Sequence, residues 1–91
     1  DGLTDQNGNK VELSKDGITL STSKTLQIDA QDIKMTAKKD VIISTSAGDV
    51  NVKGKNVELK ANMNAKMSSS LATEVSSSLN MTVKGTLVNI N

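Results

Sequence analysis

The side chains that could do chemistry in this chain are serine, threonine, lysine and the two acidic types. Two Ser-Ser-Ser runs lie at 68–70 and 76–78, but the chain has neither His nor Cys. A serine nucleophile would therefore need a lysine or a carboxylate as its base. The two runs are eight residues apart, which is typical of solvated turns that recur in a repeat. We expect no catalytic residue here and no enzyme.

The acidic and basic residues also predict no ligand site. Asp29, Asp32, Asp40 and Asp49 are separated by 3, 8 and 9 residues, which does not match the spacing of a calcium loop. No glycine-rich phosphate loop is present. The formal net charge of +1 gives no strong attraction to nucleic acid. We expect no metal, no cofactor and no nucleic-acid partner.

A repeat of about eight residues indicates which secondary structure would hold these side chains. Strong apolar residues recur at spacings of 7, 8, 7, 8, 9, 7, 8, 8, 8 and 7. The first ten are Leu13, Leu20, Ile28, Met35, Ile43, Val52, Leu59, Met67, Val75 and Val83, and Ile90 follows them. A sustained short period predicts a repeat architecture.

Most repeats carry two apolar residues around one middle residue that is usually polar, as in Val57-Glu58-Leu59. This is the period-two alternation of a short strand. Turn-forming residues separate the triplets, and the longest such corner is 44–49. We expect a lead-in loop or hairpin over residues 1–10, with its turn at Asn7-Gly8, and a shaft over 11–91.

A second apolar register lies at Met63, Leu71, Leu79 and Leu87. Together with the first register it places an apolar residue at every fourth position from 59 to 87, which leaves a helix over residues 60–80 as an alternative. A four-residue step drifts about 40° around a helix, however, and serine runs are poor helix interior. Short strands and corners are therefore favoured here.

One chain of this composition would form a weak core. The chain has 91 residues, enough for one domain, and it contains no Phe, Tyr or Trp. A single-chain solenoid would also leave its strand edges open. If three chains wind together, each short strand pairs with its neighbours and the apolar residues share one axis. The predicted fold is all-β: an intertwined homotrimeric triple-stranded β-helix, or prism, of about ten repeats per chain. The ten residues from Leu13 to Val83 would form its core.

These features resemble the C-terminal β-helix of VgrG proteins of type VI secretion systems and the central spike proteins of contractile-tailed phages. The resemblance rests on the whole-length repeat and on Val52-Lys53-Gly54 and Val83-Lys84-Gly85. It also rests on the lead-in Asn7–Leu13 and on the terminal sequence Gly85–Asn91. Only these two repeats keep the Val-x-Gly pattern of the phage members.

The resemblance implies a membrane-piercing spike at the tip of a contractile injection machine. It implies a homotrimer that meets the target cell envelope and whose blunt C-terminal end binds a PAAR-repeat tip protein. Leu87, Val88, Asn89, Ile90 and Asn91 would form that platform. Some phage spikes close their tip around iron held by His-x-His, which this chain lacks.

Charge agrees with a distinct tip, because residues 67–91 carry only Glu74 and Lys84. Uncharged strand edges suit docking by backbone pairing and apolar contact.

The absence of an initial Met leads us to expect a fragment of a longer protein, and no signal peptide is visible. The resemblance implies that the protein is secreted or virion-associated, as part of an injection machine that is assembled in the bacterial cytoplasm. The alternatives are a single-chain β-solenoid from an adhesin or filament and, for 60–80, a helical stalk.

Overall fold

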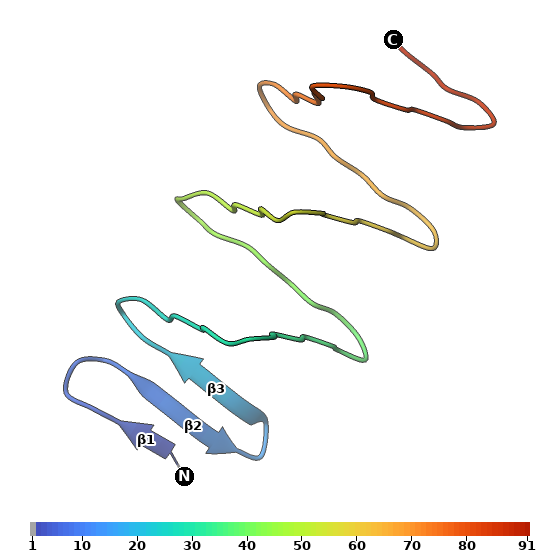
Figure 1. The fold of residues 1–91 in the computed structure, drawn as a ribbon. Coiled ribbons are helices and arrows are strands. Elements are labelled where there is room, and N and C mark those ends of the chain that lie inside the picture. The colour runs from blue at the N-terminus through green and yellow to red at the C-terminus, as the bar shows by residue number, and fades with distance from the viewer. Residues whose placement is uncertain (1) are drawn as a thin grey trace. The chain divides into compact units, whose positions relative to one another are not determined.

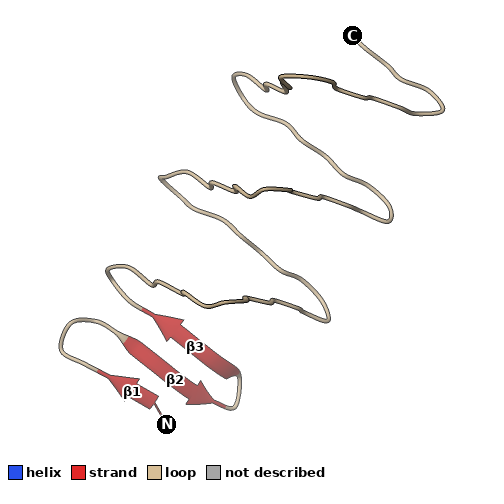
Figure 2. Cartoon of the chain, in the orientation of Figure 1, coloured by secondary structure: helices blue, strands red, loops and turns tan. Residues whose placement is uncertain are grey.

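The computed structural model describes residues 2–91, and within them the protein is all-β without a helix (Figure 2). Three strands, β1 (Gly2–Thr4), β2 (Lys10–Ser14) and β3 (Gly17–Ser21), form one antiparallel sheet in the order β1-β2-β3 (Figure 1). The all-β prediction is confirmed, and the helical alternative for residues 60–80 is wrong. The chain divides into two units, Asp1–Gly48 and Asp49–Asn91, which are considered separately below.

The three-stranded sheet has one apolar face. Val11 lies opposite Leu3 on β1 and opposite Leu20 on β3, and Leu13 lies opposite Ile18. Directly opposed residues share a face, and residues two apart along a strand share it too. The register therefore gathers these five apolar side chains on one side of the sheet. Lys10, Glu12 and the other alternate residues take the opposite side.

Two glycines allow the tight connections of this sheet. Gly8, in the loop between β1 and β2, has a φ of 89°, and Gly17, at the start of β3, has a φ of 130°. Side chains disfavour both conformations because Cβ would clash with the backbone. The lead-in segment thus contains β1 and a turn at Asn7-Gly8, and β1 pairs with the first repeat.

The loop from Asp5 to Asn9 is held by its own side chains. The Asp5 carboxylate accepts hydrogen bonds from the backbone N–H groups of Asn7 (2.8 Å) and Asn9 (3.2 Å) and from Asn9 Nδ2 (2.8 Å). Thr22 Oγ1 donates to Asn9 Oδ1, and Ser23 Oγ donates to the Asn7 carbonyl. These bonds attach the loop to the chain directly after β3.

Beyond Ser21 the chain is extended between regularly spaced bends. In the first unit the bends lie at 23–24, 31, 38–39 and 46–48, and in the second at 55–56, 62–63, 70–71, 78–79 and 86–87. At the corner expected over 44–49, the N–H of Gly48 donates to Thr45 Oγ1 at 3.3 Å. The bends therefore recur once per repeat, where the sequence predicts corners.

The strands expected beyond Ser21 do not form in the described residues of one chain. The triplets Val11–Leu13 and Ile18–Leu20 lie in β2 and β3, whereas the later triplets have no pairing partner. A strand needs a neighbour about 4.8 Å away to accept and donate its backbone hydrogen bonds. Successive repeats of this chain do not supply that neighbour to one another.

Candidate functional site

The ten residues expected to form a shared core are all solvent-exposed in the single chain. Their exposed fractions run from 50% at Leu13 to 93% at Leu59, and no described residue of the protein is buried. Leu13 and Leu20 share the apolar face of the N-terminal sheet. From Ile28 onward, each of the eight remaining residues lies on a segment without strand partners.

The second apolar register lies at the corners of the second unit. Met63, Leu71, Leu79 and Leu87 are each the second residue of a bend. Their exposed fractions are 89%, 99%, 91% and 77%. The sequence located this register, but only the structure shows that it coincides with the corners.

Glycines directly precede the bends at 55–56 and 86–87. A Cβ added to Gly54 would lie 3.2 Å from the carbonyl oxygen of Asn56, and one added to Gly85 would lie 3.2 Å from that of Leu87. Such contacts are tight for a Cβ atom. The two Val-x-Gly repeats therefore share this close approach at their corners.

The five residues expected at the tip follow the last bend. Leu87 belongs to that bend, and the chain from Val88 to Asn91 continues without another. Ile90 is 91% exposed and Val88 is 49% exposed. This segment has no charged side chain and no backbone partner within the described residues of the second unit. It can therefore offer both apolar side chains and backbone hydrogen-bonding groups to another molecule.

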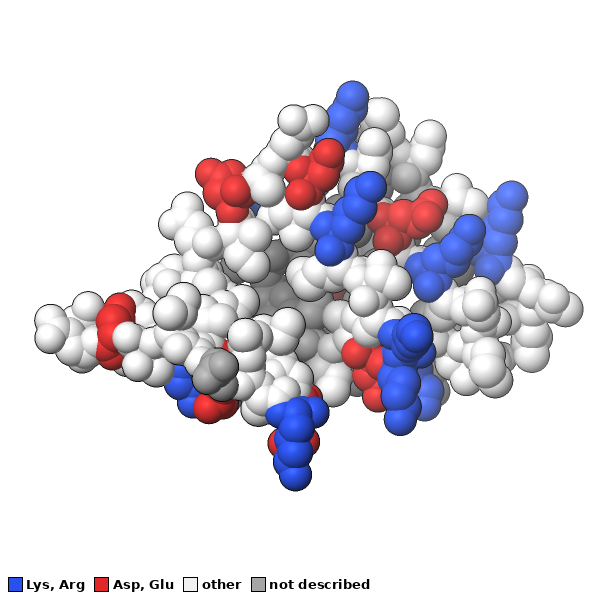
Figure 3. Space-filling view, turned by 90° about the horizontal axis from the view of Figure 1, so that it is seen from below, with Lys and Arg blue, Asp and Glu red and all other residues white. Residues whose placement is uncertain are grey.

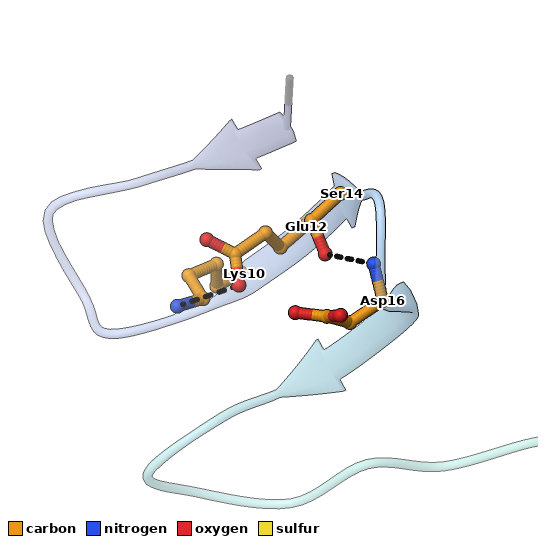
Figure 4. A network of polar contacts seen from close by, with 4 residues as sticks. All are labelled: Lys10, Glu12, Ser14 and Asp16. Atoms are coloured by element: carbon orange, nitrogen blue, oxygen red, sulfur yellow. Dashed lines mark hydrogen bonds and ion pairs between the residues drawn. The ribbon is translucent and has the colours of Figure 1, made fainter.

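An exposed ion pair and a turn contact lie in the N-terminal sheet. Lys10 Nζ lies 3.5 Å from Glu12 Oε1, and the N–H of Asp16 donates to Ser14 Oγ at 3.2 Å (Figure 4). Figure 3 shows exposed side chains of both signs of charge. An exposed ion pair of this kind contributes little stability.

The hydrogen bonds of the Asp5–Asn9 loop change the environment of the Asp5 carboxylate. The side-chain hydrogen bond from Asn9, followed by the backbone bonds from Asn7 and Asn9, lowers the pKa of Asp5 because it stabilises the ionised carboxylate. The group is fully exposed, so its part in the protein is to organise the loop.

Residues 2–91 contain no group of three or more His, Cys, Asp or Glu side chains placed to hold a metal ion. The same residues include no helix with the length and hydrophobicity needed to cross a bilayer.

The chain was compared with known proteins in three ways. No protein-family model, curated protein or solved structure gives a significant match to this chain.

Proposed function

We propose that this chain forms the shaft and tip of a membrane-piercing spike in a contractile injection machine, either a type VI secretion VgrG protein or a phage tail spike. Three copies wind into a triple-stranded β-helix, and the C-terminal end binds a PAAR-repeat tip protein. The observation that carries the proposal is the coincidence of repeat-spaced corners with apolar residues that remain exposed throughout the single chain.

The exposed area supports obligate association. The chain exposes 10349 Å². A folded monomer of this mass would expose about 5,100 Å², and the unfolded chain about 13,900 Å². The excess over a folded monomer is about 5,200 Å² per chain, far above the roughly 800 Å² per partner of an ordinary interface. An area of this size is typical of chains whose core forms only on assembly.

Unpaired strands support the intertwined arrangement. The repeats beyond Ser21 carry the alternation of strands but find no partner in their own chain. Copies wound about a common axis would supply those partners at each level, and most sheet edges would then disappear. A single-chain β-solenoid from an adhesin or filament is the alternative, and it requires pairing between turns of one chain that the described residues do not form.

The tip supports a docking function. Leu87, Val88 and Ile90 stay exposed after the last bend, and Glu74 and Lys84 are the only charges from residue 67 onward. In a trimer three such ends would meet at one level and form a platform without charge. The PAAR-repeat partner would add apolar contact and backbone pairing there.

This function places the protein in a defined cellular setting. The machine would be assembled in the bacterial cytoplasm, and the spike would then be secreted or carried on a virion. The shaft would meet the target cell envelope during penetration, and its stiffness would come from strand pairing along the whole length.

The test joins a mass measurement to a capture experiment. Light scattering should give three times the 9.6 kDa of one chain. The immobilised chain should capture a purified PAAR-repeat protein, and Ile90→Asp should abolish capture because it places three carboxylates on the platform. Thr82→Asp, which adds the same charge outside residues 87–91, is the matched control. A 9.6 kDa species rules out the trimer, and capture by Ile90→Asp equal to that of the control rules out the platform.

A further inference from the structure

In the second unit, apolar and polar residues alternate from Val57 to Leu87. The alternation keeps its phase through the corners as well as along the extended segments. From Val57 to Leu87, twelve of the sixteen odd-numbered residues are Val, Leu, Met or Ala. The other four odd positions are Ser69, Thr73, Ser77 and Gly85, which are small or short polar residues. All five charged residues of this segment fall on even positions: Glu58, Lys60, Lys66, Glu74 and Lys84. The segment therefore has one apolar side and one polar side.

The corners are eight residues apart, and this spacing explains why the alternation of apolar and polar residues keeps its phase from one corner to the next. Side chains alternate with a period of two along an extended chain, so an even repeat length returns the same side at every turn. The bends at 62–63, 70–71 and 78–79 are separated by eight residues. A repeat of seven or nine residues, as found earlier in the chain, shifts the alternation by one position.

Contacts at one corner agree with this continuity. Ser69 Oγ lies 3.0 Å from Thr73 Oγ1 and donates to the carbonyl of Ala72 at 2.7 Å. Ser69 and Thr73 belong to the odd set and lie before and after the bend at 70–71. Because their hydroxyls meet, both side chains lie on the same side of the chain around that corner.

The first unit does not have this property. Four residues after Leu20 and Met35, the equivalent corner positions carry Lys24 and Lys39. A lysine is rarely buried without a partner charge. The side that stays free of charge through its corners is therefore confined to the second unit.

We infer that the corner residues Met63, Leu71, Leu79 and Leu87 belong to the interface between copies of this chain, on the same side as Leu59, Met67, Val75 and Val83. The inference rests on the proposed homotrimer and adds a second ring of apolar side chains to each level of its C-terminal half. The occupant of this surface is a second copy of the chain. Such a copy presents the same apolar odd side and the same unpaired backbone, and the exposed area requires a large partner.

At Ala65 and Thr73 the inward position of the strand is small or polar, and a corner Met or Leu lies two residues before it. The corner side chains would fill the space that these small residues leave near the axis. Self-association would therefore depend most on the second unit.

The experiment uses the full chain and two matched double variants. Leu71→Asp with Leu79→Asp charges two corners on the odd side. Ser70→Asp with Ser78→Asp adds the same charge one residue earlier in the same corners, on the even side. Val75→Asp is a third variant, at a strand position of the proposed core. Sedimentation velocity gives the mass of each, and thermal unfolding gives the stability of any trimer that persists.

We expect the leucine pair to sediment at 9.6 kDa and the serine pair to keep three times that mass. If the leucine pair stays trimeric with the same melting temperature as the serine pair while Val75→Asp dissociates, the corners lie outside the interface and the inference is overturned, although the trimer stands. If the serine pair dissociates as well, the division into two sides is overturned. A wild-type monomer would overturn the proposed function itself.

Discussion

Leu59→Ala is the substitution that tests the shared core most directly. Leu59 is 93% exposed in the single chain, so the chain itself covers almost none of this side chain. Any stability that the truncation removes must therefore come from contacts with other copies. Lys60→Ala, at the adjacent even position, removes a comparable length of side chain from the opposite side and is the matched control.

The magnitude follows from the number of copies. Truncating a buried leucine to alanine costs about 2–5 kcal/mol. Three copies per assembly would lose about 6–15 kcal/mol together. Since each 1.4 kcal/mol is a factor of ten, the trimer dissociation constant should rise by roughly 10⁴-fold or more. The control should change the free energy of association by less than about 1 kcal/mol, as exposed charges do.

Sedimentation equilibrium over a range of protein concentrations measures this difference. The Leu59→Ala chain should dissociate at concentrations where the wild-type and Lys60→Ala chains remain trimeric. Equal dissociation constants for the two variants would refute the reasoning, because they would show that Leu59 stays in water after assembly.

Three other predictions concern local structure. Gly17→Ala should destabilise the N-terminal sheet by about 1–3 kcal/mol, measured by urea unfolding, because φ is 130° there; an unchanged midpoint would contradict this. Gly85→Val should lower the melting temperature, whereas Thr86→Val should not, since only the former adds a Cβ 3.2 Å from a carbonyl oxygen. Asn9→Ala should raise the pKa of Asp5 in an NMR titration. The stability that the ionised Asp5 carboxylate gives to the loop is complete above the unfolded pKa of about 3.9 and is lost as pH falls below that value. A loop that loosens only above pH 5 would refute this assignment.

Much of the local structure could be predicted from residue types and spacing. The triplets around Glu12 and Thr19 alternate as strands, and they are β2 and β3 in the structure. Asn7-Gly8 indicates a turn, and Gly8 has the positive φ that such turns require. The corners recur with the repeat because Ser, Asn, Lys and Gly gather at the same phase of each unit.

Other features could not be read from the sequence. The triplet around Glu58 looks like those around Glu12 and Thr19, yet it forms no strand in the described chain. Pattern alone does not say whether a hydrogen-bonding partner is present, and within residues 2–91 only β1, β2 and β3 pair as strands. The position of Leu71 and Leu79 at the corners also depended on the path of the backbone.

The sequence by itself determined the repeat, the all-β class, the corners and the loss of charge after residue 66, because these depend on local alternation and turn chemistry. Only the tertiary structure decided that pairing within one chain ends at Ser21 and that no described side chain is buried. The physical reason is that strands and cores need partners in space. Beyond Ser21 this chain provides the edges and the apolar side of such a core but not the surface that covers them.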